Sequence, residues 1–171
     1  MKPSTWKELD AEYGAFPILM AGPVPASEVT AASKSIGLGI LDDYAAFLTR
    51  YGSAIVGPYP IFGLRPVEPM GNDWSVVEMT RRFRADRWPG TEQWIVFSRD
   101  LDGNPIGLSQ EGEAWVSDHE QGGITRVASS FEAFLLQPWL QSRDRDLVHV
   151  SSARSSVALT GGVLHASTLA K

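Results

Sequence analysis

Apolar side chains recur at helical spacing through the first third of the chain. Residues 5–13 place them three and four positions apart, which predicts a short amphipathic helix. The same spacing predicts a second helix over 25–36 and a third over 41–51, each followed by a glycine that ends it. Asp42 and Asp43 lie in the first turn of the third helix, where the helix dipole favours negative charge.

The spacing then changes to short apolar runs. In 54–64, apolar residues interrupted by prolines and a glycine indicate short strands and turns. Asn72 or Asp73 is predicted to cap a further helix, which Trp88-Pro89-Gly90 terminates. Residues 93–98 are apolar at successive positions and predict a strand that is covered on both faces.

Turn residues divide the next part of the chain. Asp102-Gly103-Asn104-Pro105, Gly112 and Gly122-Gly123 separate strand-like runs, which predicts an antiparallel meander. Ser129 with Glu132 three residues later makes a capping box, which predicts a last helix.

Length and composition suit one domain. The chain has 171 residues with an apolar content of 43%, enough for a single buried core. Beyond Gln141 it becomes rich in serine and alanine, with weak alternation of apolar residues. We therefore expect one domain over residues 1–140 and a C-terminal extension over 141–171.

The charge balance narrows the classes of ligand. The chain carries 15 Lys and Arg residues against 20 Asp and Glu residues, a formal net charge of -5. A negative surface disfavours phosphate groups, so we expect no direct contact with nucleic acid, and it favours basic partners. The absence of cysteine excludes disulfides, thiolate metal sites and a cysteine nucleophile. No apolar leader or membrane-spanning run is visible, so we expect a soluble, cytoplasmic protein.

The first candidate for chemistry is a calcium-binding loop. Its candidate ligands stand at loop positions one, three, five and twelve, as such loops require: Asp100, Asp102, Asn104 and Glu111. Pro105 replaces the glycine that position six needs, and the flanking segments are strand-like. The pattern favours a hairpin turn, so we predict neither a metal nor a cofactor.

The second candidate is Asp118-His119-Glu120, because a histidine beside carboxylates can act as a general base or a metal ligand. Neighbouring strand residues point to opposite faces, so these side chains do not converge unless a turn begins there. Ser129 and Ser130 lack the G-x-S-x-G pattern of a nucleophile, and no glycine motif for phosphate binding occurs. The sequence favours a protein that is not an enzyme.

Three motifs occur in an order that resembles the SUKH superfamily, which includes fungal cell-wall assembly regulators and many bacterial immunity proteins. Residues 40–52 resemble its L-P-x-D-Y-x-x-F-L helix, with Leu41 where the family often has proline. Residues 102–107 resemble its acidic G-N-P turn, and residues 130–135 resemble its S-F-x-x-F-L helix. The resemblance covers about residues 25–138.

This resemblance implies an α+β fold in which a mixed, largely antiparallel sheet is flanked by helices, without enzymatic activity. It also implies an immunity protein that binds and neutralises a toxin domain, for example a nuclease, of a bacterial polymorphic toxin system. The alternatives are a regulatory scaffold that binds cellular proteins and, resting on the carboxylates named above, a small metal-binding protein. The oligomeric state stays open.

Five residues combine expected exposure with chemistry that suits a protein interface: Asp73, Trp74, Trp88, Glu111 and Asp118. Tryptophan is favoured at interfaces, and carboxylates would face a basic partner. For the two tryptophans, packing within the domain is the alternative, since large aromatic side chains are buried on average. Trp94 and Trp115 lie inside strand-like runs, so we expect them in the core.

Overall fold

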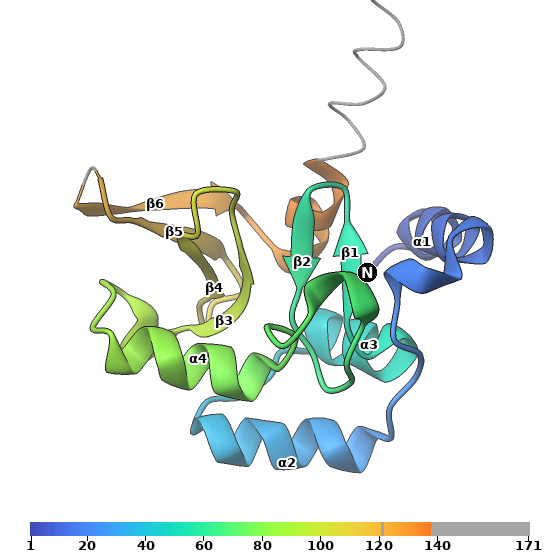
Figure 1. Ribbon diagram of the computed structural model, residues 1–171, viewed down its shortest axis with the longest axis horizontal. Helices are drawn as coiled ribbons and strands as arrows, with labels where there is room; N and C mark the ends of the chain where they lie inside the picture. Colours follow the sequence, from blue (N-terminus) through green and yellow to red (C-terminus); the bar gives the residue numbers. More distant parts are fainter. Residues whose placement is uncertain (121, 138–171) are drawn as a thin grey trace, which may run out of the picture. The chain divides into compact units, whose positions relative to one another are not determined.

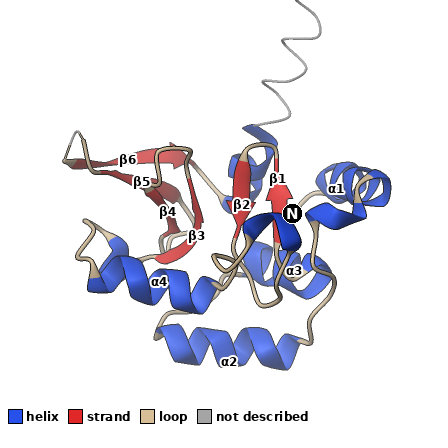
Figure 2. Cartoon of the chain, in the orientation of Figure 1, coloured by secondary structure: helices blue, strands red, loops and turns tan. Residues whose placement is uncertain are grey.

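Helices and two antiparallel sheets make up the residues that the computed structural model describes, 1–120 and 122–137 (Figure 1, Figure 2). The α-helices are α1 (Pro3–Ala15), α2 (Ala26–Ile36), α3 (Asp42–Tyr51) and α4 (Val76–Ala85), and residues 131–137 form a further helix. Short 3-10 helices occur at η1 (Pro17–Leu19), η2 (Glu68–Met70) and η3 (Thr91–Gln93). The expected extension over residues 141–171 lies outside the described part of the chain.

The strands pair with their neighbours along the chain. β1 (Ala54–Val56) and β2 (Tyr59–Ile61) form a hairpin, and β3 (Ile95–Arg99), β4 (Pro105–Leu108), β5 (Ala114–Asp118) and β6 (Gly123–Ala128) form a four-stranded sheet in that order. All of these pairs are antiparallel. The predicted α+β class and the predicted meander are confirmed, and the strands divide between two sheets.

The helices pack through the apolar faces that the sequence spacing predicts, α4 against a strand and α2 against other helices. α4 packs on β3, and its buried Thr80 hydroxyl accepts a hydrogen bond from the Val96 amide at 3.1 Å. Figure 1 shows α2 beneath α3 and α4, and α2 contacts both of these helices. The apolar face of α2 is therefore buried against helices.

The core beside the four-stranded sheet is aromatic. The ring centroid of Phe97 on β3 lies 5.9 Å from that of Tyr44, 5.3 Å from that of Phe131 and 5.1 Å from that of Phe134. Such spacings and tilted or edge-on geometries are favourable for aromatic pairs. The buried Tyr44 hydroxyl donates a hydrogen bond to the Phe62 carbonyl at 2.6 Å. The residues that the resemblance singles out in α3 and in the last helix are thus core residues.

Trp94 is buried as expected, and it explains a glycine in the acidic turn motif. A Cβ atom at Gly107 of β4 would lie 2.6 Å from the Trp94 Cβ and ring atoms, so only glycine leaves room for the indole there. Trp115, which pairs with Gly107 on the neighbouring strand, is half-buried rather than a full core residue.

The caps of two helices differ from the prediction. Ser75, rather than Asn72 or Asp73, caps α4, because its hydroxyl accepts the Glu78 amide at 3.3 Å. Asp73 instead binds Arg99, with its carboxylate 3.2 Å from the guanidinium. The Asp73 carboxylate, which the local sequence pattern assigns to the helix cap, therefore pairs with an arginine that is distant in sequence.

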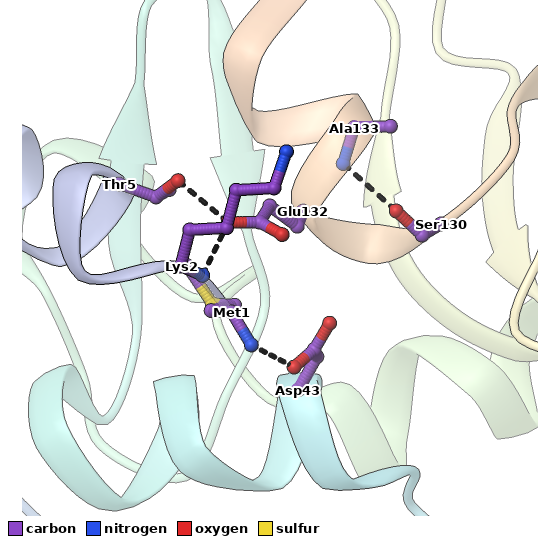
Figure 3. Close-up of polar contacts among 7 residues, drawn as sticks. All are labelled: Met1, Lys2, Thr5, Asp43, Ser130, Glu132 and Ala133. Carbon is purple, nitrogen blue, oxygen red and sulfur yellow. Dashed lines mark hydrogen bonds and ion pairs between the residues drawn. The ribbon is translucent and has the colours of Figure 1, made fainter.

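The last helix begins one residue later than the predicted capping box requires. The Ser130 hydroxyl, not that of Ser129, accepts the Ala133 amide at 3.0 Å. Figure 3 shows that the Glu132 carboxylate turns to the start of α1, where it accepts hydrogen bonds of 2.6 Å from both the Lys2 amide and the Thr5 hydroxyl. The capping-box prediction is wrong because Glu132 joins two helices instead of closing its own.

These contacts hold α1 against the rest of the domain and favour the ionised form of the Glu132 carboxyl group. Burial alone would raise the pKa of its carboxyl, but the hydrogen bonds from Thr5 and Lys2, together with the positive charges of the N-terminal amine and Lys2, hold that pKa below its ordinary value. The Met1 amine pairs with Asp43 of α3 beside them (Figure 3). α1 is therefore attached to both α3 and the last helix by polar contacts.

Candidate functional site

Two turns meet at one end of the four-stranded sheet. β3 ends at Arg99 and β4 begins at Pro105, while β5 ends at Asp118 and β6 begins at Gly123. Because consecutive strands in this sheet are antiparallel, the β3–β4 turn and the β5–β6 turn project from the same end. We call this end the turn end.

Asn104 ties the two turns together. The Asp100 carboxylate accepts hydrogen bonds from the amides of Asp102 and Asn104, at 3.0 and 2.8 Å, and from the Asn104 side-chain nitrogen at 2.9 Å. The Asn104 side-chain oxygen accepts the His119 amide at 3.2 Å and the His119 ring Nδ1 at 2.5 Å. Asn104 is buried, so one side chain sets the geometry of both turns.

The four candidate ligands of the calcium-binding loop do not come together in this arrangement. The Asp100 oxygens accept hydrogen bonds from their own turn, and Glu111 lies in the β4–β5 turn, at the opposite end of β4. These two carboxylates therefore cannot converge on one ion. Among the described residues, no group of three or more histidine, aspartate or glutamate side chains is placed to hold a metal.

Trp88 and Asp118, two of the five candidate partner residues, lie near the turn end. The Trp88 ring, in the segment after α4, has its centroid 5.7 Å from those of both Phe83 and His119. The Asp118 carboxylate accepts the Glu120 amide at 2.8 Å within the β5–β6 turn. His119 thus brings the Trp88 loop and the Asp118 turn into contact, and Trp88 is partly exposed as predicted.

The other three candidate partner residues lie outside the β3–β4 and β5–β6 turns and the Trp88 segment. Asp73 precedes α4 and binds Arg99 at 3.2 Å and Arg82 at 3.7 Å. Trp74 is partly exposed, and its carbonyl accepts the Gly63 amide at 2.6 Å. Glu111 is exposed in the β4–β5 turn, away from the turn end. The structure therefore brings Asp73 toward the turn end through Arg99 and leaves Glu111 at the opposite end of the sheet.

A groove of about 390 Å³ opens beside the β3–β4 turn. It lies between the β1–β2 hairpin, η2 and this turn, and its walls include three prolines, Pro58, Pro60 and Pro69. We call it the proline groove. Leu101 lines it from the tip of the β3–β4 turn, where this side chain is 82% exposed.

Sequence reasoning missed both Leu101 and the groove. The available signal was a leucine between two aspartates in a turn that is otherwise polar. Single exposed apolar side chains are common on protein surfaces, so Leu101 becomes a candidate contact only because it borders the groove. The groove itself combines segments that lie more than thirty residues apart in the chain.

The turn end is acidic. Four carboxylates belong to its two turns: Asp100, Asp102, Asp118 and Glu120. Two adjacent cations, Arg99 and Arg82, share the carboxylate of Asp73, at 3.2 and 3.7 Å. A surface of this sign attracts basic protein surfaces, speeds their association and repels phosphate groups. We call these four carboxylates together with Leu101 the acidic turn surface.

Comparison with known proteins agrees with this architecture. The family model described as the SMI1 / KNR4 family (SUKH-1) matches residues 23–137, more than half of the chain. The match contains α2 to β6 and leaves α1 and η1 in front of it. No curated protein sequence matches the chain. None of the helices in the described ranges is both long and apolar enough to cross a bilayer. The chain belongs to the SMI1/KNR4 family (SUKH-1).

Proposed function

We propose that this protein is a non-catalytic, cytoplasmic immunity protein that binds and neutralises a toxin domain, for example a nuclease, of a bacterial polymorphic toxin system. The family membership carries the proposal, because this family has immunity and regulatory roles. The acidic turn surface supports it. It offers negative charge and an exposed apolar side chain, as a basic protein partner requires.

Neutralisation needs only coverage of the toxin. A nuclease presents cations to the phosphates of its substrate, so its substrate groove is basic. The acidic turn surface would be drawn to that groove by opposite electrostatic potential and would exclude nucleic acid from it. Catalytic groups on the immunity protein are unnecessary for this inhibition.

The candidate partner residues differ in their support. Trp88 and Asp118 border the β5–β6 turn, and Asp73 lines the proline groove, so we propose all three within one interface. Trp74 is a flanking contact in this proposal. Glu111 lies at the other end of the sheet, and its substitution by glutamine tests whether the interface extends that far.

The second candidate function is a regulatory scaffold that binds cellular proteins without neutralising a toxin, because the family also includes regulators. The two functions differ in what the partner does. An immunity protein abolishes the toxicity of its partner, whereas a scaffold leaves the activity of its partner in place or redirects it.

The test starts with the partner. The full chain is used to capture its partner from the native cell, and the toxicity and enzymatic activity of that partner are measured with and without this protein. We expect complete inhibition at one-to-one stoichiometry. A partner that stays active in the presence of excess immunity protein would exclude neutralisation and favour the scaffold.

Charge variants then locate the interface. Asp102→Asn with Glu120→Gln removes two exposed charges from the acidic turn surface, while Glu8→Gln with Glu12→Gln removes one exposed and one half-buried charge from α1. We expect weaker inhibition for the turn variant and unchanged inhibition for the α1 variant. Equal inhibition by both variants would place the interface elsewhere.

A further inference from the structure

We propose that the proline groove is an anchor site, which takes one large apolar side chain from a basic segment of the partner, with Leu101 packing against that side chain. The proposal rests on the proposed function, since it requires a protein partner for this domain. The anchor site specifies where on this domain the partner binds and which side chains its binding segment carries.

Part of the groove wall is apolar and pre-formed, and the rest is charged. Pro58 and Pro60 come from the β1–β2 hairpin, and Pro69 comes from η2. Proline has a fixed φ and few side-chain rotamers, so such walls lose little conformational entropy when a ligand covers them. Met70, which also lines the groove, is 8% exposed, and its flexible thioether can adapt to the shape of an incoming side chain. At about 390 Å³ the groove is near the lower limit for small-molecule sites, a size that suits a side chain better than a cofactor.

Leu101 is held in position for this contact. The Asp100 carboxylate, just before Leu101, accepts hydrogen bonds from the amides of Asp102 and Asn104, which follow it. The backbone around Leu101 is therefore fixed while its side chain remains 82% exposed. An apolar group displayed on a rigid turn beside a groove can be buried by a partner without a large loss of entropy.

The charges around the groove define the flanks of the occupant. The Arg99 guanidinium, which lines the groove, pairs with Asp73 at 3.2 Å, and Asp73 is also 3.7 Å from Arg82. The carboxylates of Asp100 and Asp102 flank Leu101 at the rim. At the Leu101 rim, lysine or arginine beside the anchoring side chain would therefore meet the carboxylates of Asp100 and Asp102, whereas acidic flanks would be repelled there.

Ile124 provides the matched comparison. It is 48% exposed on β6, and it is not among the residues that line the proline groove. Leu101→Ser and Ile124→Ser each remove an exposed aliphatic side chain from the four-stranded sheet or its turns. A general effect of surface hydrophobicity would appear in both variants, and a groove-specific effect only in the first.

The test uses displayed peptides as the probe. A library of random short peptides is selected on the immobilised full chain, and the selected peptides are synthesised for calorimetry. We expect selected sequences with a leucine, phenylalanine or tryptophan flanked by lysine or arginine. We also expect Leu101→Ser to weaken their binding about ten- to a hundredfold, the range of an interface hot spot, and Ile124→Ser to leave it unchanged.

Two results would overturn the anchor site: a selection that yields no binder or only acidic sequences, and selected peptides that bind wild type and Leu101→Ser equally. The captured partner separates this inference from the proposed function. If Leu101→Ser neutralises a captured toxin as well as wild type does, the anchor site is wrong and the immunity role stands. If the peptides bind as expected but the captured partner is no toxin, the immunity role is wrong and the groove stands.

Discussion

Tyr44 shows how a single motif residue holds the core together. Its side chain is fully buried, and its hydroxyl donates to the Phe62 carbonyl at 2.6 Å. Burial raises the pKa of this phenol well above its ordinary value, so Tyr44 remains a neutral donor at every physiological pH. Its place in the family motif is explained by this hydrogen bond together with its aromatic contacts.

Tyr44→Phe should therefore destabilise the domain. The substitution keeps the ring and leaves the buried Phe62 carbonyl without this donor, at a cost of about 1–3 kcal/mol in the free energy of unfolding. Urea denaturation measures the difference. Tyr59→Phe is the control, since Tyr59 is half-buried and its ring also packs on the core. Equal stability of Tyr44→Phe and wild type would contradict the assigned role of this hydrogen bond.

Glu132 makes a prediction about pH. Its pKa is lowered in the folded state, so the carboxylate contributes stability that is present above its unfolded pKa and is lost as the pH falls through the folded value. Glu132→Gln keeps an acceptor but loses the charge, which should cost about 1 kcal/mol at neutral pH. Thermal unfolding from neutral pH to below about 4 should show the difference from wild type disappearing in acid. A difference that is independent of pH would contradict the charged hydrogen bonds to Lys2 and Thr5.

At the scale of elements, apolar spacing predicted the α-helices and β3 because each of them buries a stripe or face. The buried residues of α3, for example, are the apolar stripe that the sequence shows. By contrast, β6 is exposed over its first four residues. The caps were harder to predict. Asp73 is bound to Arg99 and Glu132 to Thr5, so tertiary partners override the local capping preference of both carboxylates.

Asn104→Asp tests the contact that holds Asn104 in the β3–β4 turn, from which its side-chain oxygen reaches His119. The substitution preserves shape but replaces the donor to Asp100 with an oxygen, so two carboxylates would face each other, at a cost of about 1–3 kcal/mol. Protonation of either carboxyl restores a donor, and the repulsion between neighbouring carboxylates raises the pKa of the pair. The cost should therefore shrink as the pH falls from neutral toward the ordinary aspartate range of about 4. Chemical denaturation at several pH values gives the measurement.

The swapped pair Asp100→Asn with Asn104→Asp is the matched control. It again places one amide opposite one carboxylate, and it should recover most of the lost stability. If the swap is no more stable than Asn104→Asp alone, the contact between the Asp100 and Asn104 side chains is not what holds Asn104 in the β3–β4 turn.

At the scale of the whole molecule, the sequence predicted the family but not the surface. The apolar motif residues of α3, β4 and the last helix are core residues, so their order along the chain is enough to indicate the fold. The proline groove combines the β1–β2 hairpin, η2 and the β3–β4 turn, and no single segment carries its pattern. In the sequence, Leu101 is a single apolar residue between two aspartates, and its significance depends on the groove beside it.

Association with a basic partner should depend on ionic strength. The carboxylates of the turn end attract the partner over a distance set by the screening length, which is about 10 Å at 0.1 M salt. The association rate constant, measured by stopped flow with the captured partner, should fall about tenfold or more between low and high salt. Asp102→Asn with Glu120→Gln should flatten this dependence, while Glu8→Gln with Glu12→Gln should not. A rate constant that does not change with salt would contradict electrostatic attraction.

The most direct test of the immunity role is a titration of the captured partner's toxic activity with the full chain. Wild type should abolish that activity at one equivalent. Leu101→Ser combined with Asp102→Asn should require a large excess, while Ile124→Ser behaves as wild type. Full activity of the partner in the presence of excess wild-type protein would contradict the immunity role.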